Sequence, residues 1–248
     1  MRDMSLLVIG DSGTGKTKFL DSMQAAGEKV FIFDFDKGTI GLKLVPRDSI
    51  FMVKDQPYWP PTVKLPPIIP NSGIYAYGTG WTKFLEKMNQ IGTQIQAGTW
   101  PYTVLAFDSI TFLGQLDINF ILKTDKDEGK NPHIGQWGQQ IQHLITLMDQ
   151  LTSWPGIKYV TAHVQRDENP ITKITERLPL VTGKFAPRLP TFFDEVYFAV
   201  VKRVGEKPVH QFITHSDSVH VQARTRFEVP DDIIQDWKEV LKYLPKVA

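Results

Sequence analysis

The chain of 248 residues contains no cysteine. This absence excludes disulfide bonds, thiolate zinc sites and a cysteine nucleophile, and it suits a reducing compartment. No apolar run approaches the length of about 18 residues that a membrane-spanning helix needs, and the apolar run near the N-terminus is too short for a signal peptide. We therefore expect a cytoplasmic protein without a membrane partner.

A strong excess of either charge is also missing, because 28 Lys and Arg stand against 27 Asp and Glu, for a net charge of +1. This balance excludes a protein that holds nucleic acid through its overall charge, so any basic site must be local. Hydrophobic residues make up 42% of the chain, which is ordinary for a soluble globular protein. The length is enough for one sizeable core, and we expect one domain over residues 1–248.

Short apolar runs alternate with helical patterns over the first two-thirds of the chain. The expected strands are 5–9, 29–34, 102–107 and 158–162, and the expected helices are 16–25, 80–96, 109–121 and 133–151. Alternation of this kind predicts an α/β fold, in which a parallel sheet is flanked by helices.

The pattern changes after residue 194. Three more strands are expected there, at 195–202, 209–215 and 219–224. The turns between them are so short that the strands must form antiparallel hairpins. A final helix is expected over 231–244, since its first residues are acidic, as a helix N-terminus favours. The sequence thus predicts a C-terminal antiparallel β-hairpin extension over 194–226, followed by a helix.

Three segments are expected to be long loops, namely 56–70, 122–132 and 166–190. Loops of this length in a compact domain are usually functional or mobile. The first of them carries six prolines, which favours an ordered surface insertion over a polyproline ligand for a partner.

Residues 10–17 form a complete G-x-x-x-x-G-K-T phosphate-binding loop between an expected strand and an expected helix, which is the context that this motif requires. Backbone N–H groups of such a loop surround phosphates, and the helix N-terminus adds its positive end. We expect ATP and Mg²⁺ as cofactors, with Lys16 at the β- and γ-phosphates and the Thr17 hydroxyl on Mg²⁺. The expected nucleotide-binding residues are Gly10, Asp11, Ser12, Gly13, Thr14, Gly15, Lys16 and Thr17.

Three acids stand at the ends of expected strands. Asp108 follows the apolar run 103–107 and is expected to bind Mg²⁺ together with Thr17. Asp34 and Asp36 follow the second strand, and their spacing points both carboxylates to one side of an extended chain. Asp36 lies further toward the edge where open α/β sheets bind ligands, so we assign it the attacking water and give Asp34 a supporting role. The alternative is a polar strand end before a turn.

The fourth strand is followed by His163 and Gln165. A His or Gln at this place faces the γ-phosphate and can report hydrolysis to the adjoining loop by gaining or losing one hydrogen bond. Both residues are therefore candidate sensors, and the alternative is an ordinary polar strand end.

In this order, the motifs resemble the RecA-like ATPase core, and in particular the small phage-encoded, RecA/Rad51-like P-loop ATPases of single-strand annealing and recombination. The later segments that carry the resemblance are 161–163, 193–197 and 222–226. The resemblance implies an ATPase that acts on single-stranded DNA in homologous recombination, in the cytoplasm of a bacterial host. It also implies a homo-oligomeric ring or short filament, with a single-strand-binding protein as a further candidate partner. Asp36 stands where the family has its catalytic acid, which is a glutamate in RecA itself.

The resemblance also assigns roles to basic residues. Arg224 and Arg226 match the paired basic residues that RecA-like subunits extend into a neighbour's nucleotide site, where arginine stabilises developing charge. The alternative for this pair is a solvated strand end. DNA contact would fall on two loops that carry Lys123, Lys126, Lys130, Lys173, Arg177, Lys184 and Arg188. Acidic neighbours dilute these charges, so the sequence alone does not establish a basic patch.

Two other functions stay open. The same phosphate-binding loop would serve a nucleotide or metabolite kinase, although a kinase usually carries an arginine-rich lid and ends on helices over a parallel sheet. In the second alternative, ATP only switches affinity for DNA or a partner, and hydrolysis is negligible. The spacing of His210, His215 and His220 favours structural roles over zinc binding.

Overall fold

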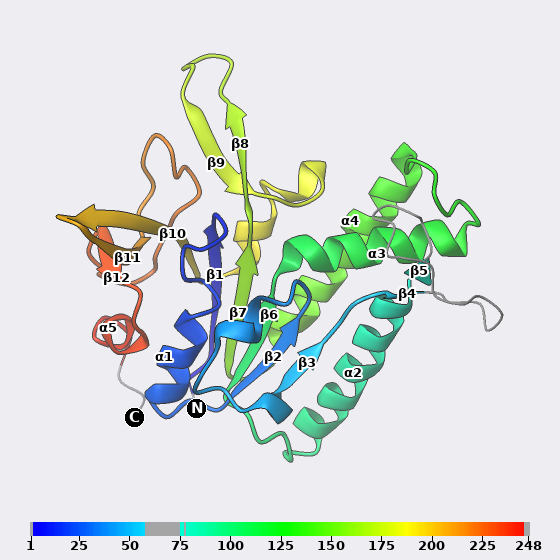
Figure 1. The fold of residues 1–248 in the computed structure, drawn as a ribbon, viewed down its shortest axis with the longest axis horizontal. Coiled ribbons are helices and arrows are strands. Elements are labelled where there is room, and N and C mark those ends of the chain that lie inside the picture. Colours follow the sequence, from blue (N-terminus) through cyan, green and yellow to red (C-terminus); the bar gives the residue numbers. More distant parts are fainter. Residues whose placement is uncertain (1, 58–74, 77, 246–248) are drawn as a thin grey trace.

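The computed structural model of the protein describes residues 2–57, 75–76 and 78–245 (Figure 1). Its centre is an eight-stranded sheet with the order β12-β11-β10-β1-β7-β6-β2-β3. The strands are β1 (Met4–Gly10), β2 (Val30–Asp34), β3 (Ile50–Met52), β6 (Val104–Asp108), β7 (Ile157–Ala162), β10 (Glu195–Val204), β11 (Lys207–Ile213) and β12 (Asp232–Ile234). The six strands from β10 to β3 are parallel, and β11 and β12 add the antiparallel extension. The α/β prediction is confirmed.

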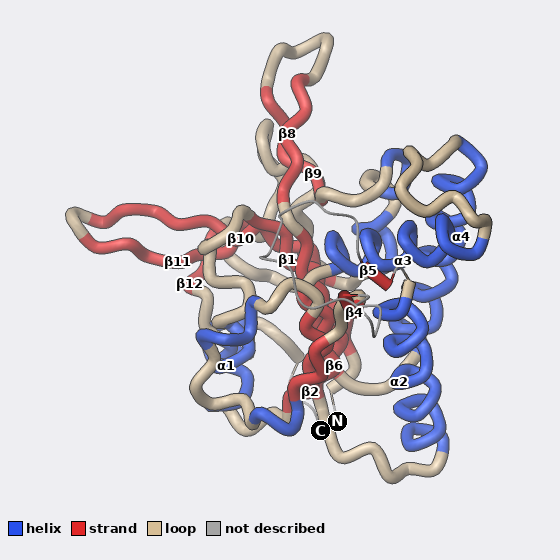
Figure 2. The backbone as a smooth tube through the Cα atoms, turned by 45° about the vertical axis from the view of Figure 1, so that its right-hand side comes forward, coloured by secondary structure: helices blue, strands red, loops and turns tan. Residues whose placement is uncertain are grey.

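Helices cover both faces of the sheet (Figures 1 and 2). They are α1 (Phe19–Ala25), α2 (Thr79–Gln96), α3 (Ile110–Thr124), α4 (Ile134–Ser153) and α5 (Trp237–Leu241). Alternate residues of the buried strands point to opposite faces, so Leu7 and Ile9 pack with α2, α3 and α4 while Leu6 and Val8 pack with α1 and α5. The core is therefore two apolar layers, one on each side of the sheet.

The register of the parallel strands decides where the polar strand ends meet. Asp34 at the end of β2 lies opposite Asp108 at the end of β6, and β7 and β1 pair alongside so that Ala162 lies opposite Ile9. The loops after β1, β2, β6 and β7 consequently leave the sheet at one carboxyl edge, which is where ligands bind in open α/β sheets.

The antiparallel extension differs from the prediction. Residues 219–224 form turns, with a single bridge between Val196 and Arg224 in place of a strand. The third antiparallel strand is β12, which lies where a helix was expected, and the C-terminal helix is reduced to α5. This segment forms a strand because its side chains alternate between the two faces of the sheet: Ile233 is buried and pairs with Phe212, whereas Ile234 is 53% exposed.

Two expected loops and one expected helix also differ. Segment 166–190 contains a hairpin of β8 (Val164–Glu168) and β9 (Thr175–Pro179), which projects beyond the carboxyl edge of the sheet (Figure 2). Helix α3 continues to Thr124, into the expected loop 122–132, and α1 begins at Phe19, three residues later than expected. Strand β3 is an addition to the prediction.

The proline-rich segment 56–70 lies outside the described residues except for Gln56–Pro57, which form β4 and pair with β5 (Tyr75–Ala76). Four short 3-10 helices, Gly38–Gly41, Arg47–Ser49, Gly183–Phe185 and Leu189–Phe192, complete the described elements. None of the helices in the described ranges combines the length and the hydrophobicity of a membrane span.

Candidate functional site

A cavity of about 440 Å³ opens at the carboxyl edge of the sheet. The loop after β1 forms one wall, the segment after β2 forms a second, and the ends of β6 and β7 form the floor. Its lining residues are Ser12, Gly13, Gly15, Lys16, Thr17, Lys18, Asp36, Gly38, Gly41, Leu42, Asp108, His163 and His210. Residues from segments up to about 200 positions apart therefore share one space.

The phosphate-binding loop supplies positive charge to this cavity. Gly13 and Gly15 have φ values of +78° and +96°, a left-handed backbone that favours glycine and lets the loop turn on itself. The Lys16 ammonium donates to the carbonyls of Gly10 and Asp11, at 2.8 and 2.9 Å, and the residue is only 6% exposed. Burial lowers the pKa of Lys16, while the carboxylates of Asp108 and Asp36 act in the opposite direction.

The Lys16 charge fits an anionic ligand. Among the described residues no carboxylate forms an ion pair with it, so its partners are neutral carbonyls alone. A buried ammonium without a directly bonded anion is costly, and phosphate oxygens would supply such a partner. The residues of the loop thus fit the triphosphate of a nucleotide.

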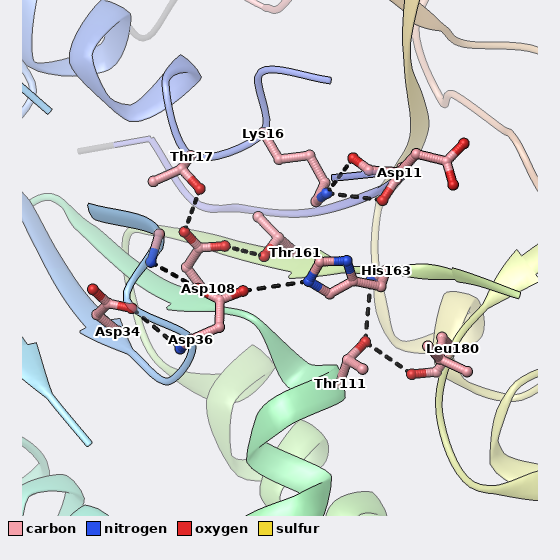
Figure 3. A network of polar contacts seen from close by, with 12 residues as sticks. Asp11, Lys16, Thr17, Asp34, Asp36, Asp108, Thr111, Thr161, His163 and Leu180 are labelled. Atoms are coloured by element: carbon pink, nitrogen blue, oxygen red, sulfur yellow. Dashed lines mark hydrogen bonds and ion pairs between the residues drawn. The ribbon is translucent and has the colours of Figure 1, made fainter. Parts of the chain in front are cut away.

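Thr17 and Asp108 form a pair of hard oxygen ligands. The Thr17 hydroxyl donates to Asp108 Oδ2 at 2.6 Å, and the buried Thr161 hydroxyl donates to Oδ1 of the same carboxylate (Figure 3). Burial raises the pKa of Asp108, and the bonds from Thr161 and Thr17 counter this shift. Hydroxyl and carboxylate oxygens at a phosphate site are the ligands that Mg²⁺ prefers, so the donor set fits that ion.

Asp36 and Asp34 have separate environments. Asp36 lines the cavity, accepts from the Gly38 N–H at 2.9 Å and places Oδ2 3.3 Å from His163 Nε2. Asp34 is 1% exposed and accepts from the hydroxyl and the N–H of Thr39 and from the N–H of Asp36. Asp34 therefore holds the turn that presents Asp36, and the assignment of the attacking water to Asp36 stays a prediction.

The two candidate sensors are placed differently. His163 lines the cavity, its N–H donates to the Thr111 hydroxyl, and its ring meets the Phe112 ring edge-on. The Gln165 side chain donates to Asp167 at 3.1 Å and does not line the cavity. The neighbouring Arg166 reaches the phosphate-binding loop instead, with Nη2 2.7 Å from Asp11 Oδ2. Sequence reasoning did not assign a role to Arg166. Its only signal in the sequence was a positive charge directly after His163 and Gln165.

The antiparallel extension also contacts the phosphate-binding loop. His210 Nδ1 lies 3.0 Å from the Thr14 carbonyl, which can only accept, so Nδ1 carries the proton. A Cβ atom on Gly15 would come within 2.5 Å of Gln235 Oε1 and 2.9 Å of His210 Nδ1. Sequence reasoning missed this role of His210 and Gln235, because no local pattern links β11 or the residue after β12 to the loop.

Arg224 and Arg226 lie away from the cavity of their own chain. Arg224 Nη2 donates to the carbonyl of Pro190 at 2.9 Å, and Arg226 Nη1 pairs with Asp194 at 2.9 Å. Both adjoin the start of β10. Glu195, the first residue of β10, pairs with Leu6, which lies four residues before the end of β1. They do not share a strand, because Arg224 forms only an isolated bridge with Val196 and Arg226 lies outside any strand. Action on a neighbouring subunit stays a prediction.

The seven basic residues proposed for DNA contact separate into two groups (Figure 1). Lys123, Lys126 and Lys130 lie at or beyond the end of α3, whereas Lys173 and Arg177 lie on the β8–β9 hairpin and Lys184 and Arg188 follow it. Lys130 pairs with Asp127 at 2.6 Å and Lys173 with Glu168 at 3.4 Å. The structure therefore does not gather them into one basic patch.

Comparison with known proteins identifies the family. A family model described as "AAA domain" matches residues 2–227. Among solved structures, a KaiC-like protein from the archaeon Pyrococcus horikoshii has a TM-score of 0.42 and 11% identity, over 85% of this chain and 77% of that one. The flagellar accessory protein FlaH from Methanocaldococcus jannaschii also has a TM-score of 0.42 and 11% identity, over 93% and 84%. No curated protein matches significantly. On the match over most of its length, the chain belongs to the AAA domain family of P-loop NTPases.

Proposed function

We propose that this protein hydrolyses ATP with Mg²⁺ and acts on single-stranded DNA in phage-type homologous recombination or annealing, as a homo-oligomer. The observation that carries the hydrolytic part is the arrangement of three groups around one cavity. Lys16 lies on the phosphate-binding loop, the Thr17 hydroxyl of the same loop contacts Asp108 at the end of β6, and Asp36 lies beside His163. These are a phosphate anchor, a metal position and a base.

Each residue of the cavity would have a separate role in hydrolysis. Lys16 would bind the β- and γ-phosphate oxygens, and the N–H groups of the loop would bind the remaining phosphate oxygens. A magnesium ion held by Thr17 and Asp108 would neutralise charge on those oxygens. Asp36 would orient the attacking water and accept its proton, since its carboxylate lines the same cavity.

His163 would link turnover to the hairpin. Its ring lies beside Asp36, while its backbone is fixed to α3 through Thr111 and to the segment after β9 through Leu180, whose N–H donates to the His163 carbonyl at 2.7 Å. A change in the Asp36–His163 contact would therefore be transmitted to the projecting β8–β9 hairpin. The DNA and recombination parts of the proposal rest on the resemblance of the motifs.

One experiment separates this proposal from its two rivals. Phosphate release from MgATP would be measured with and without single-stranded DNA, and the same reactions would be searched for phosphorylated acceptors. We expect release that single-stranded DNA increases. Transfer of the γ-phosphate to a small molecule would show a kinase, and ATP binding without turnover under either condition would show a nucleotide-controlled binding protein.

A further inference from the structure

A second hollow of about 260 Å³ lies beside the nucleotide cavity and shares Asp36 with it. It is lined by Asp34, Phe35, Asp36, Lys37, Met52, Val53, Lys54 and Phe112. This volume is below the range of roughly 300–1,000 Å³ for pockets that enclose a whole small molecule. The hollow can therefore hold one unit of a longer ligand better than a complete one.

The rim of the hollow exposes apolar surface. Phe112, in the first turn of α3, is 42% exposed, and Met52, at the end of β3, is 50% exposed. Phe112 lines the hollow and is partly exposed, and an exposed aromatic ring is a surface on which a planar base of any identity can stack.

The rim also carries two lysines, Lys37 and Lys54, beside the carboxylates of Asp34 and Asp36. Within the described part of the chain, the ammonium groups of Lys37 and Lys54 have neither a hydrogen bond nor an ion pair. Both oxygens of Asp34 and both oxygens of Asp36 are already engaged by Thr39, the Asp36 and Gly38 N–H groups, and His163. Lys37 has a φ of 66°, a left-handed conformation that a residue other than glycine adopts mainly where its surroundings impose it. The two ammonium groups are therefore free to bind phosphates, while the oxygens of the two acids already have hydrogen-bond partners.

We infer that this hollow binds one nucleotide unit of a single-stranded polynucleotide, with its base on Phe112 and its flanking phosphates on Lys37 and Lys54. This inference rests on the proposed function and places DNA contact beside the catalytic acid, outside the two basic loops. The Phe112 and His163 rings meet edge-on with centroids 5.6 Å apart, and His163 contacts Asp36. A base stacked on Phe112 would therefore act on the His163 ring, which contacts the carboxylate of Asp36. Through these two contacts, DNA binding would affect ATP turnover.

The test measures binding of fluorescein-labelled oligo-dT by anisotropy over a series of salt concentrations. Phe112→Leu removes the aromatic face and should weaken binding about tenfold without changing the salt dependence. Lys37→Gln/Lys54→Gln should lower the slope of log K against log salt by about 1.4, for two phosphate contacts at about 0.7 each. Phe112→Trp should restore the affinity.

The matched control is Lys29→Ala/Lys238→Ala, which removes two exposed lysines that line neither the cavity nor the hollow. It should bind oligo-dT as the wild type does. Thermal unfolding and MgATP affinity verify that each variant is folded. Unchanged affinity and slope in the hollow variants, with a wild type that binds, would overturn this inference alone.

Two further outcomes are decisive. Failure of the wild type to bind oligo-dT would remove the proposed function itself. If dTMP competes as well as oligo-dT at equal nucleotide concentration, the occupant is a free nucleotide, and the assignment to a polynucleotide is wrong.

Discussion

The carboxyl edge of the sheet and the antiparallel extension follow different rules. At the edge, the groups that matter belong to short motifs, each directly after a buried strand, and parallel register brings Asp34 opposite Asp108. In the extension, β11 pairs with β10 and with β12, and the segment between Ile213 and Asp232 forms turns. The local sequence pattern determines the structure of the edge, whereas strand pairing between distant residues determines the structure of the extension.

The two regions nevertheless meet at the phosphate-binding loop. His210 on β11 lies 3.0 Å from the Thr14 carbonyl, and the side chain of Gln235 lies over Gly15. The extension thus contacts the loop, and the carboxyl edge carries the acids and the histidine that line the same cavity.

The largest effect on ATP turnover is expected from Arg224 and Arg226, the residues of the extension that are proposed to take part in catalysis. Arg224→Ala/Arg226→Ala should leave ATP binding by the isolated subunit nearly unchanged, because both side chains lie away from its own cavity. Turnover should fall by about 10³-fold or more if these arginines complete a neighbour's site. Phosphate release and ATP affinity measure the two effects separately.

Mixed assemblies provide the control for this prediction. Lys16→Ala subunits should also be inactive, since they lose the phosphate anchor. Mixing them with Arg224→Ala/Arg226→Ala subunits should partly restore turnover at interfaces that pair an intact loop with intact arginines. If the variants co-assemble and no ratio restores activity, the arginines act only within their own chain, through their bonds to Pro190 and Asp194.

The contrast between regions also explains what the sequence could predict. The strands β1, β2, β6 and β7 follow from apolar runs such as Val-Phe-Ile-Phe, which are buried on both faces. The phosphate-binding loop follows from its motif, and the expectation that Asp36, Asp108 and His163 meet at one edge follows from parallel topology. These inferences need only local sequence and one topological rule.

The failures have a common cause. The β8–β9 hairpin projects into solvent and pairs Arg166 with Arg177 and Asp167 with Glu176, so neither face leaves an apolar period to detect. The contacts Arg166–Asp11 and His210–Thr14 join residues 155 and 196 positions apart. Strand β3 has only three residues. No local pattern specifies such features.

The second prediction concerns the two acids of the edge. Asp36→Asn should retain MgATP binding and lose about 10²- to 10⁴-fold in turnover, because an amide keeps the size but cannot accept a proton. Asp34→Asn should act mainly on stability, since Asp34 bonds Thr39 within the turn. Comparing turnover and thermal unfolding of both variants checks this, and the roles are reversed if Asp34→Asn alone abolishes hydrolysis.

The third prediction tests the contact between the regions, using two glycines of one loop. Gly13→Ala adds only backbone strain, of about 1 kcal/mol, because nothing lies within 4 Å of its Cβ. Gly15→Ala adds similar strain and a clash with Gln235 and His210. Without nucleotide, we expect Tm to fall by about 2–4 °C for Gly13→Ala and by about twice that for Gly15→Ala.

A double variant sharpens this comparison. Gln235→Ala should relieve part of the Gly15→Ala defect while leaving Gly13→Ala unchanged, as expected for coupled neighbours. Equal unfolding temperatures for the two glycine variants, or no recovery with Gln235→Ala, would show that the extension does not bear on the loop.

The smallest effect is expected in the helical layer, which belongs to neither region. Asp117 on α3 is fully buried, its Oδ1 lies 2.8 Å from His143 Nδ1 on α4, and Trp81 stacks on the His143 ring. The bond to Asp117 raises the pKa of His143 above its ordinary value of 6.5, and burial raises the pKa of Asp117. The protonated histidine thus stabilises the fold.

The direction of the pH effect follows from that shift. Stability from a raised histidine pKa is fully present below the unfolded value of 6.5 and is lost as the pH rises through the folded value, so Tm should fall between about pH 5.5 and 8.5. His143→Gln keeps a donor for Asp117 but cannot titrate, so it should remove this fall, of about 1–2 °C for a partly exposed group. Thermal unfolding of the wild type and His143→Gln at both pH values is the measurement. An equal fall in both proteins would show that the pH dependence comes from groups other than the His143–Asp117 pair.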